Sequence, residues 1–196
     1  MKTDLSIEAF VLAGGKSSRM GRDKGLLPLN GQPMVSRVLK VLQELALPVR
    51  IIANKPGYES LGYEVLKDEV LEKGPMGGLY TAFRHSSADL VLLVACDMPL
   101  ISTEAGCMLM NAASIDHITV AAEGDKLNPL FALYPRGLKE KLKDRLDKGE
   151  LKMVDFILGT RHILVTSIGE KMPWALRNIN NENDLKEVEE KWGDLL

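Results

Sequence analysis

The chain has 196 residues, of which 45% are hydrophobic and 27% are charged, and its formal net charge at pH 7 is −2. This length suits one compact domain, and the apolar content is sufficient for a buried core. The slightly acidic balance and an aromatic content of only 5% argue against a nucleic-acid-binding module or a protein drawn to anionic membranes, so any attraction for a polyanionic ligand must be local.

The strands and helices predicted along the chain alternate. Apolar runs and periodicity predict strands at 9–13, 49–53, 63–66, 90–95, 118–122, 130–134 and 163–165. Helices are predicted over 35–45, after Gly78, over 103–113, over 139–148, and at the end of the sequence with Asn181 as the cap. This alternation predicts an α/β fold, a three-layer α/β/α domain with a mostly parallel, Rossmann-like sheet. Such sheets bind ligands beyond the carboxyl ends of their strands.

The cysteines and the apolar runs indicate the compartment. Cys96 and Cys107 form no C-x-x-C pair, so neither a zinc site nor a disulfide framework is predicted. No apolar run approaches the roughly 20 residues that span a bilayer, and residues 1–8 lack the apolar core of a signal peptide. We therefore expect a soluble, cytoplasmic protein.

A basic, glycine-rich loop follows the first predicted strand, in the string LAGGKSSRMGRDKG from Leu12 to Gly25. It carries four cations within nine residues: Lys16, Arg19, Arg22 and Lys24. Glycines let backbone N–H groups approach an anion, and the cations can neutralise a triphosphate. The string is not a P-loop, because Phe10 stands where the first glycine is required, and it lacks the dinucleotide fingerprint. The alternative is a solvated basic turn, which the coincidence of strand, glycines and charge disfavours.

This loop resembles the signature L-A-G-G-x-S-x-R-M-G-x-x-K of the molybdenum cofactor guanylyltransferases, a branch of the nucleotidyltransferase superfamily. The resemblance implies that the loop wraps the triphosphate of a nucleotide. The residues to which it gives this role are Leu12, Ala13, Gly14, Gly15, Arg19 and Lys24. Gly14-Gly15 favours the guanylyl branch, because cytidylyl relatives more often have Ala-Ala-Gly there. The expected fold is then of the nucleotide-diphospho-sugar transferase type, one domain over 1–196 with a nucleotide-binding half (1–100) and an acceptor-binding half (101–196).

Two further strand ends and one helix start are candidate nucleotide contacts. Asn54 and Asp68 follow the second and third predicted strands and are unexceptional alone, but in the resembling family residues at both places contact the guanine nucleotide. The string GPMGGL from Gly74 opens a helix, whose exposed N–H groups suit a ligand. The family's G-P-L-A-G contacts base and ribose here, which assigns Gly74, Pro75 and Gly78 to the nucleotide. A simple glycine turn is the alternative.

Asp97 closes the most apolar predicted strand, in the string ACDMPL. A carboxylate there is costly to desolvate unless it is paired or binds a metal, and Mg²⁺ prefers one or two carboxylates together with phosphate oxygens. We predict that Asp97 faces the basic loop, while Cys96 points to the other side as a core residue. The C-D-x-P aspartate of the resembling family binds magnesium, which implies Mg²⁺ on Asp97. A helix cap is the alternative.

The last third of the sequence carries the predicted acceptor residues. Asn178-Ile179-Asn180 resembles the family's N-x-N motif, which assigns Asn178 and Asn180 to the acceptor; a turn residue is the alternative for Asn180. Asn128 stands where the family often has a histidine, so this sequence departs from the family within the predicted acceptor pocket.

By resemblance, the predicted reaction transfers GMP from GTP to the phosphate of molybdenum-molybdopterin and releases pyrophosphate. Lys24, Arg19 and Asp97 are the predicted catalytic residues, and Mg²⁺ is the predicted cofactor. An acceptor phosphate is already ionised, so positioning and charge neutralisation suffice without a general base. CTP or another nucleotide, a sugar-phosphate acceptor, and a non-catalytic nucleotide-binding regulator remain as alternatives. Transient contacts with cofactor-assembly proteins are expected, and contacts with nucleic acid or membrane are not.

Overall fold

The fold is that of a computed structural model, which describes residues 5–13, 23–191 and 193. Three of the predicted site residues, Gly14, Gly15 and Arg19, lie outside this described part of the chain. The other predicted site residues lie within it.

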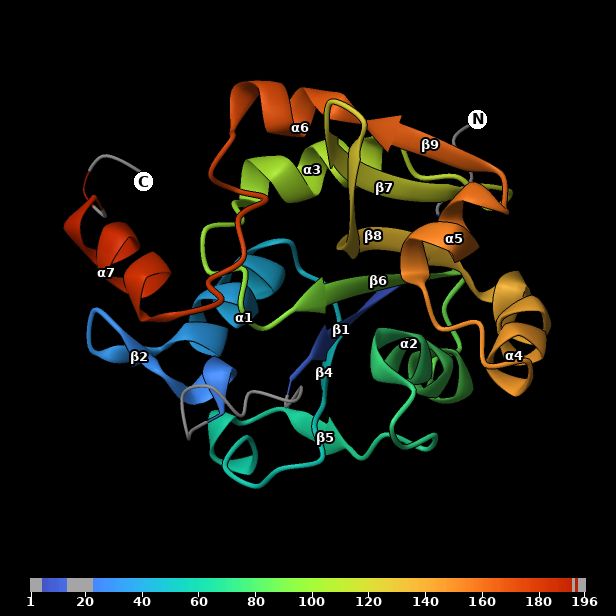
Figure 1. Cartoon of the computed structure of the whole chain (residues 1–196), viewed down its shortest axis with the longest axis horizontal. Helices are drawn as coiled ribbons and strands as arrows, with labels where there is room; N and C mark the ends of the chain where they lie inside the picture. Colours follow the sequence, from blue (N-terminus) through green and yellow to red (C-terminus); the bar gives the residue numbers. More distant parts are fainter. Residues whose placement is uncertain (1–4, 14–22, 192, 194–196) are drawn as a thin grey trace.

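A seven-stranded sheet with the order β5-β4-β1-β6-β8-β7-β9 forms the centre of the molecule (Figure 1). Its strands are β1 (Ile7–Leu12), β4 (Val49–Ile52), β5 (Glu64–Leu66), β6 (Leu90–Ala95), β7 (Ile118–Glu123), β8 (Lys126–Pro135) and β9 (His162–Val165). Strand β1 pairs in parallel with β4 and β6, β4 pairs in parallel with β5, and β7 with β9. Only β8 runs antiparallel to its neighbours β6 and β7 among the described strands of this sheet. The predicted mostly parallel α/β sheet is confirmed.

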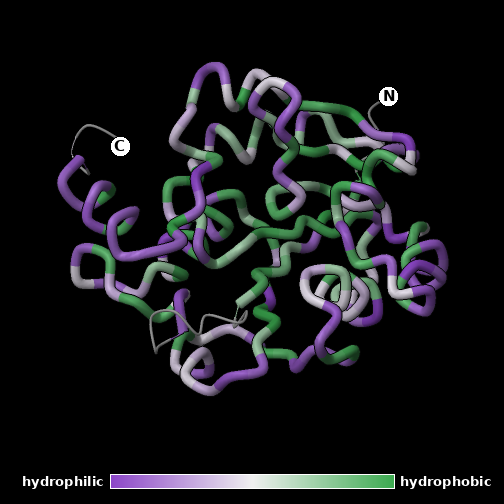
Figure 2. The backbone as a smooth tube through the Cα atoms, in the orientation of Figure 1, coloured by the Kyte–Doolittle hydropathy of each residue, from purple (hydrophilic) through white to green (hydrophobic). Residues whose placement is uncertain are grey.

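Helices cover both faces of the sheet. Successive side chains of a strand point to opposite faces, so neighbouring residues of β6 belong to two different cores. In β6, Leu92 and Val94 join a core with α1 (Met34–Glu44), α3 (Thr103–Asn111) and α6 (Thr166–Lys171). Val91 and Leu93 instead join a core with α2 (Gly74–His85), α4 (Lys139–Asp147) and α5 (Met153–Leu158). Figure 2 shows hydrophobic colours along the central strands and mainly hydrophilic colours on the outer helices. This arrangement is the predicted three-layer α/β/α architecture.

The last described helix, α7 (Glu182–Glu190), packs on a small hairpin rather than on the sheet. The hairpin consists of β2 (Pro28–Leu29) and β3 (Gln32–Pro33), and Leu29 shares a third apolar cluster with Ile179 and Val188 (Figure 1). The Asn181 side chain accepts hydrogen bonds from the first-turn N–H groups of α7, so the predicted cap is confirmed. The segment that leads to α7 therefore returns to the hairpin that closely follows Lys24 in the chain.

Several elements differ from the prediction that the apolar periodicity gave. Helix α2 begins at Gly74, as the string GPMGGL predicted, so Gly77 and Gly78 lie inside it, whereas the periodicity placed the helix after them. A Cβ atom on Gly78 would lie 2.5 Å from Leu12 Cδ2, and one on Gly77 would lie 2.7 Å from the Val70 carbonyl oxygen. These glycines therefore allow close packing of the helix, a tertiary effect that outweighs their low helix propensity.

Strand β8 is also longer than predicted, and it includes Asn128 and Pro129. Its register against β7 shifts between Val120 and Ala121, as in a bulge. Proline has no N–H group to donate to the hydrogen-bond ladder. It is tolerated at such an irregularity because the ladder is interrupted there.

Two short helices, α5 and α6, were not predicted from the sequence. Both are six residues long, which is too short for a clear helical periodicity. No helix among the described residues is long and apolar enough to cross a membrane.

Candidate active site

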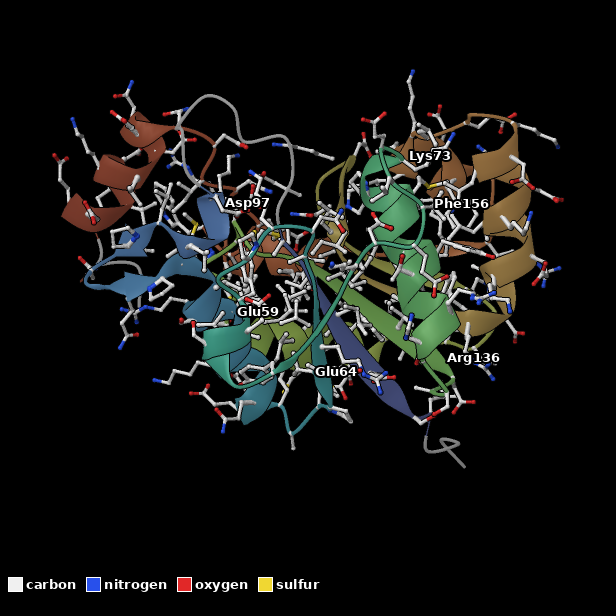
Figure 3. All side chains as sticks on the ribbon, turned by 90° about the horizontal axis from the view of Figure 1, so that it is seen from below. Glu59, Glu64, Lys73, Asp97, Arg136 and Phe156 are labelled. Atoms are coloured by element: carbon white, nitrogen blue, oxygen red, sulfur yellow. The ribbon has the colours of Figure 1, made fainter. Side chains whose placement is uncertain are left out.

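Four of the predicted functional side chains meet beyond the carboxyl ends of β1 and β6. These are Lys24, Asp97, Asn178 and Asn180. Figure 3 shows Asp97 at the same end of the sheet as Lys73, the residue before α2, whereas Glu64 and Arg136 lie at the opposite end. The site is therefore at the edge where parallel α/β sheets bind ligands.

Lys24 and Asp97 form the charged centre of this group. The Lys24 Nζ atom lies 3.5 Å from Asp97 Oδ2 and donates to Asn180 Oδ1 at 2.9 Å. The two charged side chains are only 20% and 16% exposed, respectively. The prediction that Asp97 faces the basic loop is confirmed at Lys24, the only one of the loop's four cations that the structure describes.

The N-x-N segment holds Asp97 from the other side. Asn178 Nδ2 donates to Asp97 Oδ1 at 2.9 Å, and the Ile179 N–H donates to the Asp97 carbonyl at 2.9 Å. Of the two residues predicted to bind the acceptor, Asn178 thus contacts Asp97, the predicted metal ligand. Asn180 contacts Lys24, which is predicted to bind the triphosphate. The four predicted side chains therefore form one connected group.

The alternative interpretation of Asp97 as a helix cap is wrong. The cap of α3 is Ser102, whose side chain accepts from the Ala105 N–H. Cys96 is 7% exposed and lies in the core with α1 and α3, as predicted.

A single carboxylate such as Asp97 fits a magnesium site that is completed by phosphate oxygens and water. Among the described residues no three His, Cys, Asp or Glu side chains gather as a preformed metal cluster. From the described residues Asp97 accepts one hydrogen bond at each oxygen, which leaves further lone pairs for a metal. Magnesium commonly takes one or two carboxylates plus substrate phosphates, so the donor set is of the right chemistry.

Asn54 and Asp68, which are predicted to contact the guanine nucleotide, form a second group at the ends of β4 and β5. The Asp68 N–H donates to Asn54 Oδ1 at 2.9 Å. Asp68 Oδ1 accepts from the Thr81 hydroxyl at 2.8 Å and from the Val70 N–H at 3.2 Å. Because Thr81 lies on α2, these bonds fix the strand ends against that helix.

The start of α2 and the end of β1 lie next to these strand ends. Gly74 and Pro75 are exposed, whereas Gly78 is buried against Leu12. Ala13 continues the pairing of β1, because its N–H donates to the Ile52 carbonyl at 2.9 Å. Gly78 thus has a packing role that the sequence prediction did not include, and its contact with a nucleotide stays a prediction.

Asn128, which replaces a histidine of the resembling family, anchors the segment before the N-x-N motif. Its Nδ2 donates to the Leu176 carbonyl at 3.2 Å, and its Oδ1 accepts from the Leu130 N–H at 3.2 Å. The first bond ties β8 to the chain two residues before Asn178.

Asp23 and Tyr58, which lie buried beside the turn that begins at Lys24, were not predicted from the sequence. Asp23 is the side-chain N-cap of a 3₁₀ turn, η1 (Lys24–Leu26), and Tyr58 donates to it. An aspartate directly before a short turn is a cap signal that could have indicated Asp23. No sequence pattern points to Tyr58.

The fold and the site together define a class. A lysine and a carboxylate meet beyond the carboxyl ends of neighbouring strands, which is where α/β proteins with a mostly parallel sheet bind their ligands. Sequence comparison gives the particular family. The chain belongs to the family of the MobA-like NTP transferase domain, whose profile matches residues 9–162.

Similar proteins support this assignment over almost the whole chain. The chain is 34% identical over 184 residues to a probable molybdenum cofactor guanylyltransferase of Flavobacterium johnsoniae, covering 93% of this chain and 96% of that protein. It is 34% identical over 190 residues to a molybdenum cofactor guanylyltransferase of Shewanella loihica, covering 94% and 96%. The crystal structure of molybdopterin-guanine dinucleotide biosynthesis protein A from Archaeoglobus fulgidus has the same fold, with a TM-score of 0.76 at 24% identity over 95% of this chain and 99% of that one.

Proposed function

We propose that this protein transfers GMP from GTP to the phosphate of molybdenum-molybdopterin and releases pyrophosphate, with Mg²⁺ bound at Asp97. The observation that carries this proposal is the contact of Lys24, Asp97, Asn178 and Asn180 at one edge of the sheet. The names of the relatives supply the guanylyl group and the acceptor. GTP and the molybdopterin-type acceptor are accordingly the proposed partners.

The reaction is an in-line displacement at the α-phosphorus of GTP. An oxygen of the acceptor phosphate forms a bond to this phosphorus, and the bond to the bridging oxygen of pyrophosphate breaks. The attacking oxygen carries negative charge at neutral pH, so no proton has to be removed. The chain's own contribution is therefore to bind, orient and neutralise charge.

Each residue of the site has a defined task in this reaction. The Lys24 ammonium stabilises the charge that grows on the leaving pyrophosphate, and Asn180 orients that ammonium. Asn178 orients the Asp97 carboxylate, which would hold the metal. Magnesium, when bound, would neutralise phosphate oxygens and act as a Lewis acid on them. Arg19 is proposed to assist Lys24, and Asn54, Asp68 and the start of α2 are proposed to bind the nucleoside.

The first experiment is calorimetric titration with GTP, CTP, ATP and UTP, each in the presence of magnesium. The proposal predicts a preference for GTP that Asp68→Ala weakens. A preference for CTP or UTP would keep the chemistry and overturn the substrate, and binding of none of the four would contradict a nucleotide site.

A second experiment tests the role of Asp97. We expect Asp97→Ala to abolish pyrophosphate release from GTP and molybdenum-molybdopterin while the protein stays folded. Asp147→Ala is the matched control, because Asp147 also pairs with a lysine, at 2.6 Å, but on the exposed side of α4. Near-wild-type turnover of Asp97→Ala at saturating magnesium would exclude the proposed role.

A further inference from the structure

A buried carboxylate and a buried phenol lie next to the turn that carries Lys24. Asp23 Oδ1 accepts two hydrogen bonds, one from the Gly25 N–H at 3.2 Å and one from the Tyr58 hydroxyl at 2.5 Å. The Asp23 side chain is 6% exposed and Tyr58 is fully buried. Asp23 precedes Lys24 and Gly25 follows it. The hydrogen bond between these two neighbours, together with the bond from Tyr58, holds the turn at Lys24 in place.

The turn is packed closely against the residues below it. A Cβ atom on Gly25 would lie 2.5 Å from the Tyr58 hydroxyl and 3.0 Å from Cys96 Sγ. Cys96 directly precedes Asp97, and its N–H donates to the Leu12 carbonyl at 3.0 Å. The turn of Lys24, the end of β1 and the residue before Asp97 are thus held in one rigid contact.

Among the described residues, little compensates the charge at the second oxygen of Asp23. Asp23 Oδ2 is buried and has no hydrogen-bond partner among the described residues, and the Lys55 ammonium approaches it only to 3.8 Å from a side chain that is 47% exposed. A buried carboxylate in this state costs stability. Its structural role is to hold two segments together, because its other oxygen accepts hydrogen bonds both from Gly25 in the turn and from Tyr58 in the loop after β4.

Tyr58 is a dependable donor in this pair. Burial raises the pKa of its hydroxyl far above the usual range, and the neighbouring Cys96 thiol and Asp23 carboxylate raise it further. The phenol therefore keeps its proton and can donate to Asp23 throughout the pH range of ordinary assays.

We propose that Asp23 and Tyr58 are positioning residues for the transfer reaction, which fix the η1 turn so that the Lys24 ammonium points to the site it shares with Asp97 and Asn180. The inference rests on the proposed role of Lys24 at the triphosphate. Without the hydrogen bond between Tyr58 and Asp23, the turn would keep the Lys24 ammonium but lose its fixed orientation. A misplaced catalytic group of this kind lowers the rate even when it remains chemically intact.

The test variant is Tyr58→Phe, which removes one hydroxyl and keeps the ring. We expect kcat for pyrophosphate release to fall about tenfold, since a small displacement of a catalytic group has effects of this order or larger. In a Lys24→Ala background the same change should alter kcat by less than about twofold, because coupled residues are not additive. The affinity for GTP should fall more than the affinity for GMP, which lacks the phosphates that Lys24 is proposed to bind.

Tyr134→Phe is the matched control. Tyr134 is also fully buried, and its hydroxyl donates a single bond, at 2.8 Å, to the Pro129 carbonyl, but it lies in the core on the other face of the sheet. We expect it to lose stability as Tyr58→Phe does while its kcat and its ratio of GTP to GMP affinity stay at the wild-type values.

Two variants of Asp23 separate its geometry from its charge. Asp23→Asn keeps an oxygen that can accept both hydrogen bonds, so we expect its kcat within about threefold of wild type. Asp23→Ala removes that oxygen and should lower kcat at least as much as Tyr58→Phe.

The inference is overturned if Tyr58→Phe and Lys24→Ala reduce kcat independently, or if Tyr58→Phe affects kcat no more than Tyr134→Phe. If the wild-type protein releases no pyrophosphate from GTP and the acceptor, the proposed function fails instead. The ratio of GTP to GMP affinity then decides on the positioning pair: a ratio that falls in Tyr58→Phe supports it, and an unchanged ratio overturns it.

Discussion

Replacing Lys24 by alanine separates the catalytic contribution of its ammonium from its contribution to stability. The ammonium lies 3.5 Å from Asp97 Oδ2, and the lysine side chain is 20% exposed. A partly exposed pair contributes about 0–1 kcal/mol to the free energy of unfolding, and 1 kcal/mol corresponds to about 2–4 °C in Tm for a chain of this size. Loss of one transition-state donor costs about 100-fold in kcat, or about 2.7 kcal/mol of activation free energy. Lys24→Ala should therefore be nearly inactive and almost as stable as the wild type.

The assay measures pyrophosphate release at saturating GTP, magnesium and acceptor, together with the Tm of each variant. Lys143→Ala is the control, because it removes one ammonium from an ion pair with Asp147, on the exposed side of α4. It should keep wild-type kcat. A loss below about threefold for Lys24→Ala would show that Lys24 is an ordinary surface charge rather than a transition-state donor. A fall in Tm far beyond about 4 °C would assign the lost activity to unfolding.

Two further predictions concern packing and pH. Gly77→Ala places a Cβ atom 2.7 Å from the Val70 carbonyl oxygen, a backbone atom that cannot turn aside, and should cost about 1–3 kcal/mol of stability. Gly137→Ala meets no atom within 4 Å and should be close to neutral; equal Tm values for the two variants would contradict this reasoning. The hydrogen bond from Arg177, followed by that from Lys191, lowers the pKa of Glu187 from 4.5 to about 2. Its stabilising contribution is therefore fully present above pH 4.5 and is lost as the pH falls through about 2. NMR titration should find this low pKa in the wild type and a value nearer 4.5 in Arg177→Ala, and a value near 4.5 in both would refute the pairing.

The position of Lys24 opposite Asp97 could be predicted because it follows from topology alone. Both residues come after strands that read as buried and parallel, and parallel strands present their carboxyl ends at one edge. The N-x-N segment could be assigned only by resemblance, because nothing in its own pattern places it beside strands that precede it by some 80 residues or more.

The extent of helix α2 and the direction of β8 show why some features of the fold could not be predicted from the sequence. Glycine favours turns over helices by its intrinsic propensity, and only contact with Leu12 and Val70 explains Gly77 and Gly78 within α2. Apolar patterning does not give the direction of a strand. The two-residue link Gly124-Asp125, between Glu123 and its partner Lys126, was a hairpin signal that could have indicated the antiparallel pairing of β7 and β8.

The buried pair of Asp23 and Tyr58 was beyond local pattern analysis. The two residues are 35 positions apart, in segments that carry no periodicity. Their association depends on how the loop after β4 packs beneath the η1 turn, which is a property of the assembled core.

The contact between Lys24 and Asn180 also has a consequence for synthesis of the chain, because these residues are 156 positions apart. At translation rates of about 5–20 residues per second, Asn180 follows Lys24 from the ribosome by about 8–30 s. During that interval β1, β4, β5 and β6 can already pair, with Asp97 at their edge but without Asn178, which hydrogen-bonds to it, or Asn180, which hydrogen-bonds to Lys24. A nascent chain would thus carry a nearly finished sheet with an unfinished candidate site, and this site would be completed only when the last segment has folded back onto the first.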